Sequence, residues 1–119
     1  MATIPYENIR TPLDGRMKLF RWAAMAEGDV GQAVPAGEFN DKTFRVAGTF
    51  AGGAAVIAEG SLIPEATDVG DYDQLVDPQG NPISFTLKGI ETVLENVYLL
   101  RPRVVGGSGV DVTVHLLVR

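Results

Sequence analysis

The chain has 119 residues, of which 45% are hydrophobic and 21% are charged, and its formal net charge is −5. This length and composition indicate one folded domain with a single core, and they exclude a chain that is disordered throughout. An acidic chain without a Lys/Arg cluster argues against nucleic acid as a partner. The absence of cysteine excludes disulfides and zinc–thiolate sites. Since no apolar run reaches the length of a membrane span, we expect synthesis in the cytoplasm and no membrane partner.

Residues 1–16, "MATIPYENIRTPLDGR", contain two prolines, one glycine and no sustained hydrophobic period. This pattern predicts an irregular N-terminal arm, which leaves residues 17–119 as the folded domain. The arm either packs on its own domain or docks onto a neighbouring subunit. The residues that would anchor it to a neighbour are spread along its length: Ile4, Tyr6, Ile9, Arg10 and Leu13.

The first half of the domain shows two alternating segments. In residues 17–26 the alternation places Phe20, Trp22 and Ala24 on one face, and in residues 42–50 it places Phe44, Val46 and Phe50 together. Gly52 and Gly53 separate the second segment from the apolar run at 54–61. Because glycine readily takes the positive φ angles of tight turns, we predict that these two runs form an antiparallel hairpin.

The second half continues with short strands and turns. Asp77-Pro78-Gln79-Gly80 has the residue order of a type I turn and predicts a second hairpin. We expect an irregular turn through Asn96, a strand at 97–105, a glycine turn at 106–109 and a final strand at 110–118. At least six strands without a long helix predict an all-β fold, a single antiparallel β-sandwich or jelly-roll-like domain. The inward residues of the last strand are Val110, Val112, Val114, Leu116 and Val118.

Residue patterns that carry catalysis or metal binding are scarce. The single histidine, His115, lies on the outward face of the last predicted strand, without a recognisable nucleophile motif. The carboxylates of residues 65–73 lack the residue order of a calcium loop, and the glycine pairs do not precede a helix as phosphate loops do. We therefore expect neither enzymatic activity nor a metal or cofactor.

Two further features bear on partners. Proline cannot donate a ladder hydrogen bond, so Arg101-Pro102-Arg103 predicts a strand edge or a bulge. The two arginines then either protect that edge from aggregation or meet acidic groups on a partner. Trp22 is either a core residue or an interface anchor.

Three segments, in this order, carry a resemblance to a known group of proteins: "FRVAGTFAGGAAVIAEGS", "LVDPQGNPISFT" and "ENVYLLRPRVVGGSGVDVTVHLLVR". The chain resembles the head decoration, or cementing, proteins of tailed double-stranded DNA bacteriophages. The resemblance implies a β-sandwich or jelly roll that forms a homodimer or homotrimer on the capsid exterior of the virion. It also implies binding to the major capsid protein, so that neighbouring capsid subunits are clamped against the pressure of the genome, and it supplies no catalytic residues.

The same segments are similar, more weakly, to discoidin-like sugar-binding β-sandwiches. This second resemblance implies a carbohydrate- or receptor-binding module of a phage tail or fibre. Such a module needs an exposed aromatic platform, for which Tyr72, Tyr98 and Trp22 are the candidates.

Overall fold

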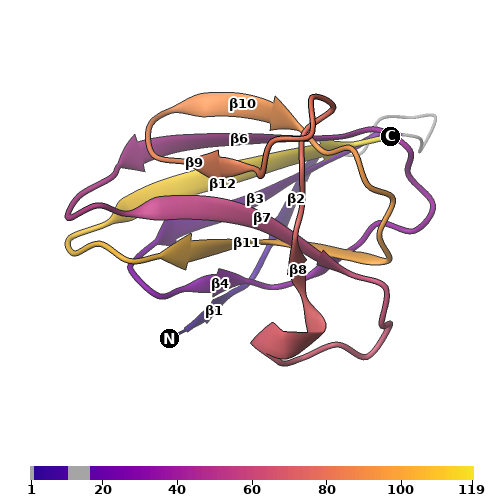
Figure 1. The fold of residues 1–119 in the computed structure, drawn as a ribbon, viewed down its shortest axis with the longest axis horizontal. Helices are drawn as coiled ribbons and strands as arrows, with labels where there is room; N and C mark the ends of the chain where they lie inside the picture. The colour runs from indigo at the N-terminus through magenta and orange to yellow at the C-terminus, as the bar shows by residue number, and fades with distance from the viewer. Residues whose placement is uncertain (1, 11–16) are drawn as a thin grey trace.

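The computed structural model describes residues 2–10 and 17–119, which form two β-sheets packed face to face (Figure 1). The seven-stranded sheet has the order β1-β4-β11-β7-β8, with β5 paired to β11 and β9 paired to β7; the five-stranded sheet has the order β10-β6-β12-β3-β2. This arrangement confirms the predicted all-β sandwich. The strands are β1 (Thr3–Ile4), β2 (Glu7–Arg10), β3 (Lys18–Met25), β4 (Val30–Gly31), β5 (Val34–Pro35), β6 (Lys42–Thr49), β7 (Ala55–Ser61), β8 (Asp73–Gln74), β9 (Ser84–Phe85), β10 (Gly89–Thr92), β11 (Leu99–Val105) and β12 (Asp111–Val118).

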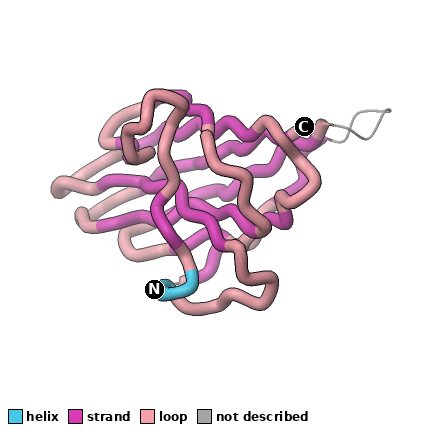
Figure 2. Tube along the Cα trace, turned by 45° about the vertical axis from the view of Figure 1, so that its right-hand side comes forward, coloured by secondary structure: helices cyan, strands magenta, loops and turns pink. Residues whose placement is uncertain are grey.

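The core lies between the two sheets, where the alternation of the long strands directs apolar side chains. The four predicted inward residues of β12 itself are fully buried, and Val110, just before it, is also buried. Phe44 and Val46 of β6 join them from the same sheet, and Leu100 and Val104 of β11 join them from the opposite sheet. In the described residues the one helical segment is the 3-10 turn η1 (Val69–Asp71), drawn in cyan in Figure 2.

The predicted hairpin at Gly52-Gly53 is wrong, because β6 and β7 belong to different sheets. β6 pairs with β10 and β12, whereas β7 pairs with β11. The turn at 106–109 likewise carries the chain from β11 in one sheet to β12 in the other. The two turns lie against each other: Ser108 N donates to Ala51 O at 3.1 Å, and a Cβ on Gly52 (φ +67°) would lie 2.8 Å from Ser108 N. Contact between the two turns therefore favours a fold in which both of them cross from one sheet to the other.

Residues 2–10 are edge strands of the sandwich and differ from the irregular arm expected. β1 pairs in parallel with β4 in the seven-stranded sheet, and β2 pairs antiparallel with β3 in the five-stranded sheet. Ala2 N donates to Asp29 Oδ1 at 3.2 Å. Strands this short have no detectable period, so the alternation of side chains could not predict them. Residues 11–16, including Leu13, lie outside the described residues.

Two local features also differ from the sequence-based expectation. Ala24 has φ 55° at a shift of register between β3 and β12, so the side chain of Met25, and not that of Ala24, enters the core. Residues 89–92, expected within an irregular turn, form β10 on β6. The type I turn is confirmed: Gly80 N donates to Asp77 O at 2.9 Å, and Asp77 Oδ1 accepts hydrogen bonds from Gln79 N and Asn81 N.

Pro102 does not mark an edge, which corrects the interpretation of β11. The strand lies in the interior of its sheet, between β7 on one side and β4 and β5 on the other. Leu100 pairs with Val34 and Arg103 pairs with Val30, so Pro102 faces the interruption between β4 and β5. A missing N–H is tolerated there because no continuous ladder runs along that side of the strand.

We predict that Gly31→Ala destabilises the sandwich by about 1–3 kcal/mol. A Cβ at Gly31 would lie 2.6 Å from Pro102 Cδ and 2.7 Å from Trp22 Nε1, so the packing of the proline ring and the indole would have to shift. Urea unfolding measures the effect. The matched control is Gly70→Ala, whose Cβ meets nothing within 4 Å. Equal unfolding midpoints for the two variants would contradict the close packing at Gly31.

Candidate functional site

The structure places the predicted contact residues of the N-terminal segment and of β3 in different environments. Ile4 and Tyr6 pack against the core, and the Tyr6 ring meets the Phe20 ring edge-on, with 5.2 Å between centroids. Ile9 is exposed, whereas no side-chain position is described for Arg10. Trp22 is fully buried, donates its indole N–H to Gln32 O at 3.0 Å and stacks on Phe44. Trp22 is therefore a core residue.

Arg101 and Arg103 share one buried carboxylate. Arg101 Nε donates to Glu59 Oε1 at 2.7 Å, and Arg103 Nε donates to Glu59 Oε2 at 3.1 Å. All three side chains alternate with core residues of β7 and β11, so they lie on the outer face of the seven-stranded sheet. Arg101 and Glu59 are nevertheless buried, while Arg103 is partly exposed. A charged group on this face is buried only where another segment covers it.

Arg101 is covered by Tyr72, the last residue of the loop of residues 62–72. The Tyr72 ring lies over the Arg101 guanidinium, 3.6 Å from centroid to Cζ, as in a cation–π contact. Burial raises the pKa of the Tyr72 phenol, and the phenol donates to Ala66 O at 3.5 Å. Arg101 Nη2 is buried without a hydrogen-bond partner among the described residues. Sequence reasoning missed this contact, because Tyr72 and Arg101 are far apart along the chain.

The loop is further ordered by hydrogen bonds of its own. Asp71 Oδ2 accepts from the backbone N–H groups of Thr67 and Asp68, both at 3.2 Å. Ser61 Oγ accepts from Ile63 N at 3.0 Å. The loop holds apolar side chains in solvent: Leu62, 75% exposed, together with Ile63 and Val69.

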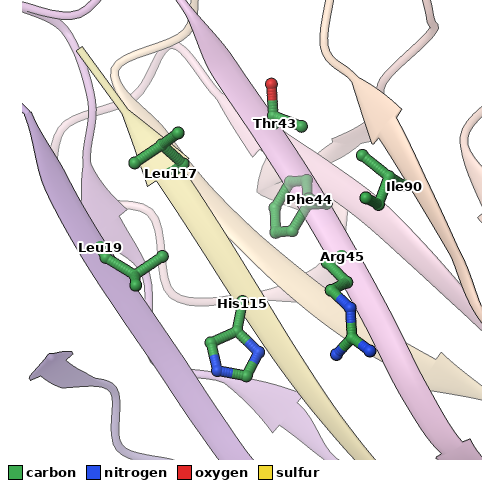
Figure 3. Close-up of a pocket in the computed structure, with 7 residues that line it drawn as sticks. All are labelled: Leu19, Thr43, Phe44, Arg45, Ile90, His115 and Leu117. Carbon is green, nitrogen blue, oxygen red and sulfur yellow. The ribbon is translucent and has the colours of Figure 1, made fainter.

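The outer face of the five-stranded sheet carries a shallow pocket of about 360 Å³. We call it the Leu117 pocket; it is lined by Leu19, Thr43, Phe44, Arg45, Ile90, His115 and Leu117. Figure 3 shows the aliphatic side chains of Leu19, Leu117 and Ile90 around those of His115 and Arg45. Backbone pairing sets His115 of β12 opposite Arg45 of β6 on one side and Arg21 of β3 on the other.

The electrostatics of this pocket are set by two arginines and an imidazole. Arg21 pairs with Glu7 at 3.1 Å, whereas Arg45 has no carboxylate partner among the described residues. Burial, and then the positive charges of Arg45 and Arg21, lower the pKa of His115 below its ordinary value of 6.5. His115 Nδ1 is buried and has no hydrogen-bond partner in the described part of the chain. The pocket is thus apolar, and at its rim lies Arg45, a cation without a carboxylate partner in the part of the chain that the structure describes.

A smaller hollow surrounds Tyr98, which is 45% exposed and lies beside Pro35, Gly37 and Glu38. The other two aromatic candidates, Tyr72 and Trp22, are buried. Within residues 2–10 and 17–119, no group of three or more His, Asp or Glu side chains is placed to hold a metal ion. Nor is any helix in that part of the chain long and apolar enough to cross a membrane.

Comparisons with known proteins reveal likeness of fold. No protein-family model and no curated protein sequence matches the chain. Among solved structures, the SPBc2 prophage-derived protein YomS has a TM-score of 0.58 and 14% identity, covering 86% of this chain and 93% of YomS. The periplasmic g-type lysozyme inhibitor PliG of Aeromonas hydrophila has a TM-score of 0.52 and 13% identity, covering 99% and 96%. At these identities the chain is similar to both proteins in its β-sandwich architecture.

We predict that Glu59→Gln lowers the free energy of unfolding by about 3 kcal/mol, because it leaves the Arg101 charge buried without a counter-ion. Denaturant unfolding followed by circular dichroism measures the loss. Glu7→Gln, which breaks the exposed pair with Arg21, is the matched control and should leave the midpoint unchanged. A Glu59→Gln variant as stable as the control would show that the buried pair is dispensable.

We predict that the chain loses stability as the pH falls from 6.5 toward the lowered folded-state pKa of His115. In this window the unfolded chain binds a proton at His115 and the folded chain does not, so protonation favours unfolding. His115→Gln removes this contribution. Urea midpoints of both proteins between pH 7.5 and 5 measure the difference in slope, and parallel pH profiles would refute the shift.

Proposed function

We propose that the chain is a non-enzymatic structural protein of a phage virion, which binds the capsid exterior and clamps neighbouring copies of the major capsid protein. The observation that carries the proposal is the likeness of fold to the prophage-derived protein YomS, which extends over most of both chains. The order of turns and strands that resembles head decoration proteins supports the same assignment. The proposal gives the chain no cofactor and no reaction.

The physical argument for such a role is linkage. A protein that binds the assembled shell, and not its free subunits, stabilises the shell by its binding free energy at every occupied site. A single rigid sandwich suits this task, because little conformational entropy is lost when a preordered surface docks. The exposed apolar side chains on its surface, among them Ile9 and Leu62, supply contact area.

The predicted contact residues take two roles in this proposal. Ile9 and Arg103 are at least partly exposed and can touch a capsid subunit directly. Trp22 and Arg101 are buried and support the surface from within, and Ile4 and Tyr6 fix the N-terminal strands to the domain. Arg10 and Leu13 remain predicted contacts of the N-terminal segment.

The alternative function, a carbohydrate- or receptor-binding module of a tail or fibre, is favoured by one observation. Tyr98 is exposed beside Glu38, so an aromatic face and a hydrogen-bonding carboxylate are available together. Binding of a soluble glycan to the wild-type protein, lost on Tyr98→Ala, would select this alternative.

The clamp is tested on heads of the phage that encodes the chain, with and without the protein. We expect heads that lack it to release DNA at a lower temperature, as followed by access of a DNA-binding dye, and added protein to restore the wild-type temperature. Ile9→Asp should reduce occupancy on heads severalfold, because it places a charge in an apolar contact. Leu94→Asp, at another exposed apolar residue, is the matched control. If heads with and without the chain open at the same temperature, the clamp is refuted.

A further inference from the structure

We propose that the chain associates with copies of itself head to tail, with the 62–72 loop of one copy docked in the Leu117 pocket of the next. This inference goes beyond the proposed function, because it names the self-association surface and concerns the protein alone, away from any capsid. Two features of the same chain, on opposite faces of the sandwich, carry it.

The loop has the properties of a preformed docking element. Leu62 and Ile63 follow directly after β7, and Val69 lies in η1; all three side chains are exposed. The Tyr72–Arg101 contact and the hydrogen bonds to Asp71 hold the loop in this conformation. Docking a loop that is already ordered costs less conformational entropy than ordering a free segment.

The Leu117 pocket has the matching properties of a receptor. Leu19 and Leu117 lie directly opposite each other on neighbouring strands, and Ile90, 65% exposed, lines the pocket from β10. These side chains offer a concave apolar surface of the size needed for one or two aliphatic side chains. Burying Leu62 and Ile63 there would remove apolar area of both copies from water.

Charge selects the loop as the occupant. The loop carries Glu65 and Asp68 beside its apolar residues, on a chain of net charge −5, whereas the pocket carries Arg45 at its rim, which pairs with no carboxylate of residues 2–10 and 17–119. Docking the loop brings these carboxylates toward Arg45. Packing two pockets face to face would instead bring Arg45 against its own copy, and like charges in contact oppose association.

Geometry requires that loop and pocket meet between copies. The loop covers the outer face of the seven-stranded sheet through Tyr72 and Arg101, and the pocket lies on the outer face of the five-stranded sheet. In Figure 1 the coil of η1 lies at the bottom and β10 at the top. The interface is therefore heterologous: each copy contributes its 62–72 loop to one neighbour and its Leu117 pocket to another.

The experiment measures sedimentation equilibrium of the full chain and of two single variants. Leu62→Asp places a charge among the apolar residues of the loop and leaves the pocket unchanged. Arg45→Glu reverses the charge at the rim of the pocket and leaves the loop unchanged. We expect each variant alone to associate at least about tenfold more weakly than wild type. Mixed in equal amounts, the two variants should form a heterodimer, because the intact loop of the Arg45→Glu copy fits the intact pocket of the Leu62→Asp copy.

Controls separate this junction from general effects. Val105→Asp changes an exposed apolar residue outside both surfaces and should associate as wild type does. Wild-type association should weaken as salt rises, since a charge pair contributes to it. Val69→Asp and Leu117→Ser repeat the mixing test at the same two surfaces if either first variant lacks the wild-type circular dichroism spectrum.

Three results would overturn the inference. One is a wild-type chain that stays monomeric up to millimolar concentration. Another is a Leu62→Asp variant that associates as strongly as wild type, which would make the loop irrelevant. The third is a mixture of the two variants that forms no more dimer than either does alone. Because no capsid is present, none of these results bears on the clamp.

Discussion

The outer face of the seven-stranded sheet is organised around one buried ionic contact, in which Glu59 bridges Arg101 and Arg103. Removing these charges from water is costly, and the cost is offset here by the short Arg101–Glu59 contact and by the Tyr72 ring over the guanidinium. Tyr72 closes the 62–72 loop, so its contact with Arg101 and the hydrogen bonds to Asp71 together hold that loop on the sheet. The alternation of side chains alone would leave the outer face of the seven-stranded sheet exposed to water. Tyr72 covers this face at Arg101.

The second constraint is the way in which the chain crosses between sheets. Both glycine turns, at 52–53 and 106–107, pass from one sheet to the other, and a hydrogen bond between Ser108 and Ala51 holds them together. As a result β12, the most regular strand, lies in the middle of the five-stranded sheet between β6 and β3. Its outward residues His115 and Leu117 then form the centre of a pocket instead of an edge.

These constraints yield a β-sandwich with the two proposed contact surfaces on opposite faces. The loop is apolar and acidic, and the Leu117 pocket is apolar with an arginine at its rim. Such complementarity within one chain suits a protein that works as part of an assembly, and it agrees with the proposed role on a virion surface. The chain has no cysteine, so packing, hydrogen bonds and ion pairs take the place of disulfides in holding its loops.

The sequence by itself determined the all-β class, the burial of alternate residues in β12 and the turn at Asp77, because these follow from side-chain period and turn chemistry over a few residues. Only the tertiary structure decided that β6 and β7 belong to different sheets, that residues 3–10 join the sheets and that Pro102 lies in the interior of a sheet. It alone brought Tyr72 over Arg101 and Ile90 beside His115. The physical reason is that alternation is a local property of a strand, whereas the partner of each strand, and the burial of each charge, depend on segments distant along the chain.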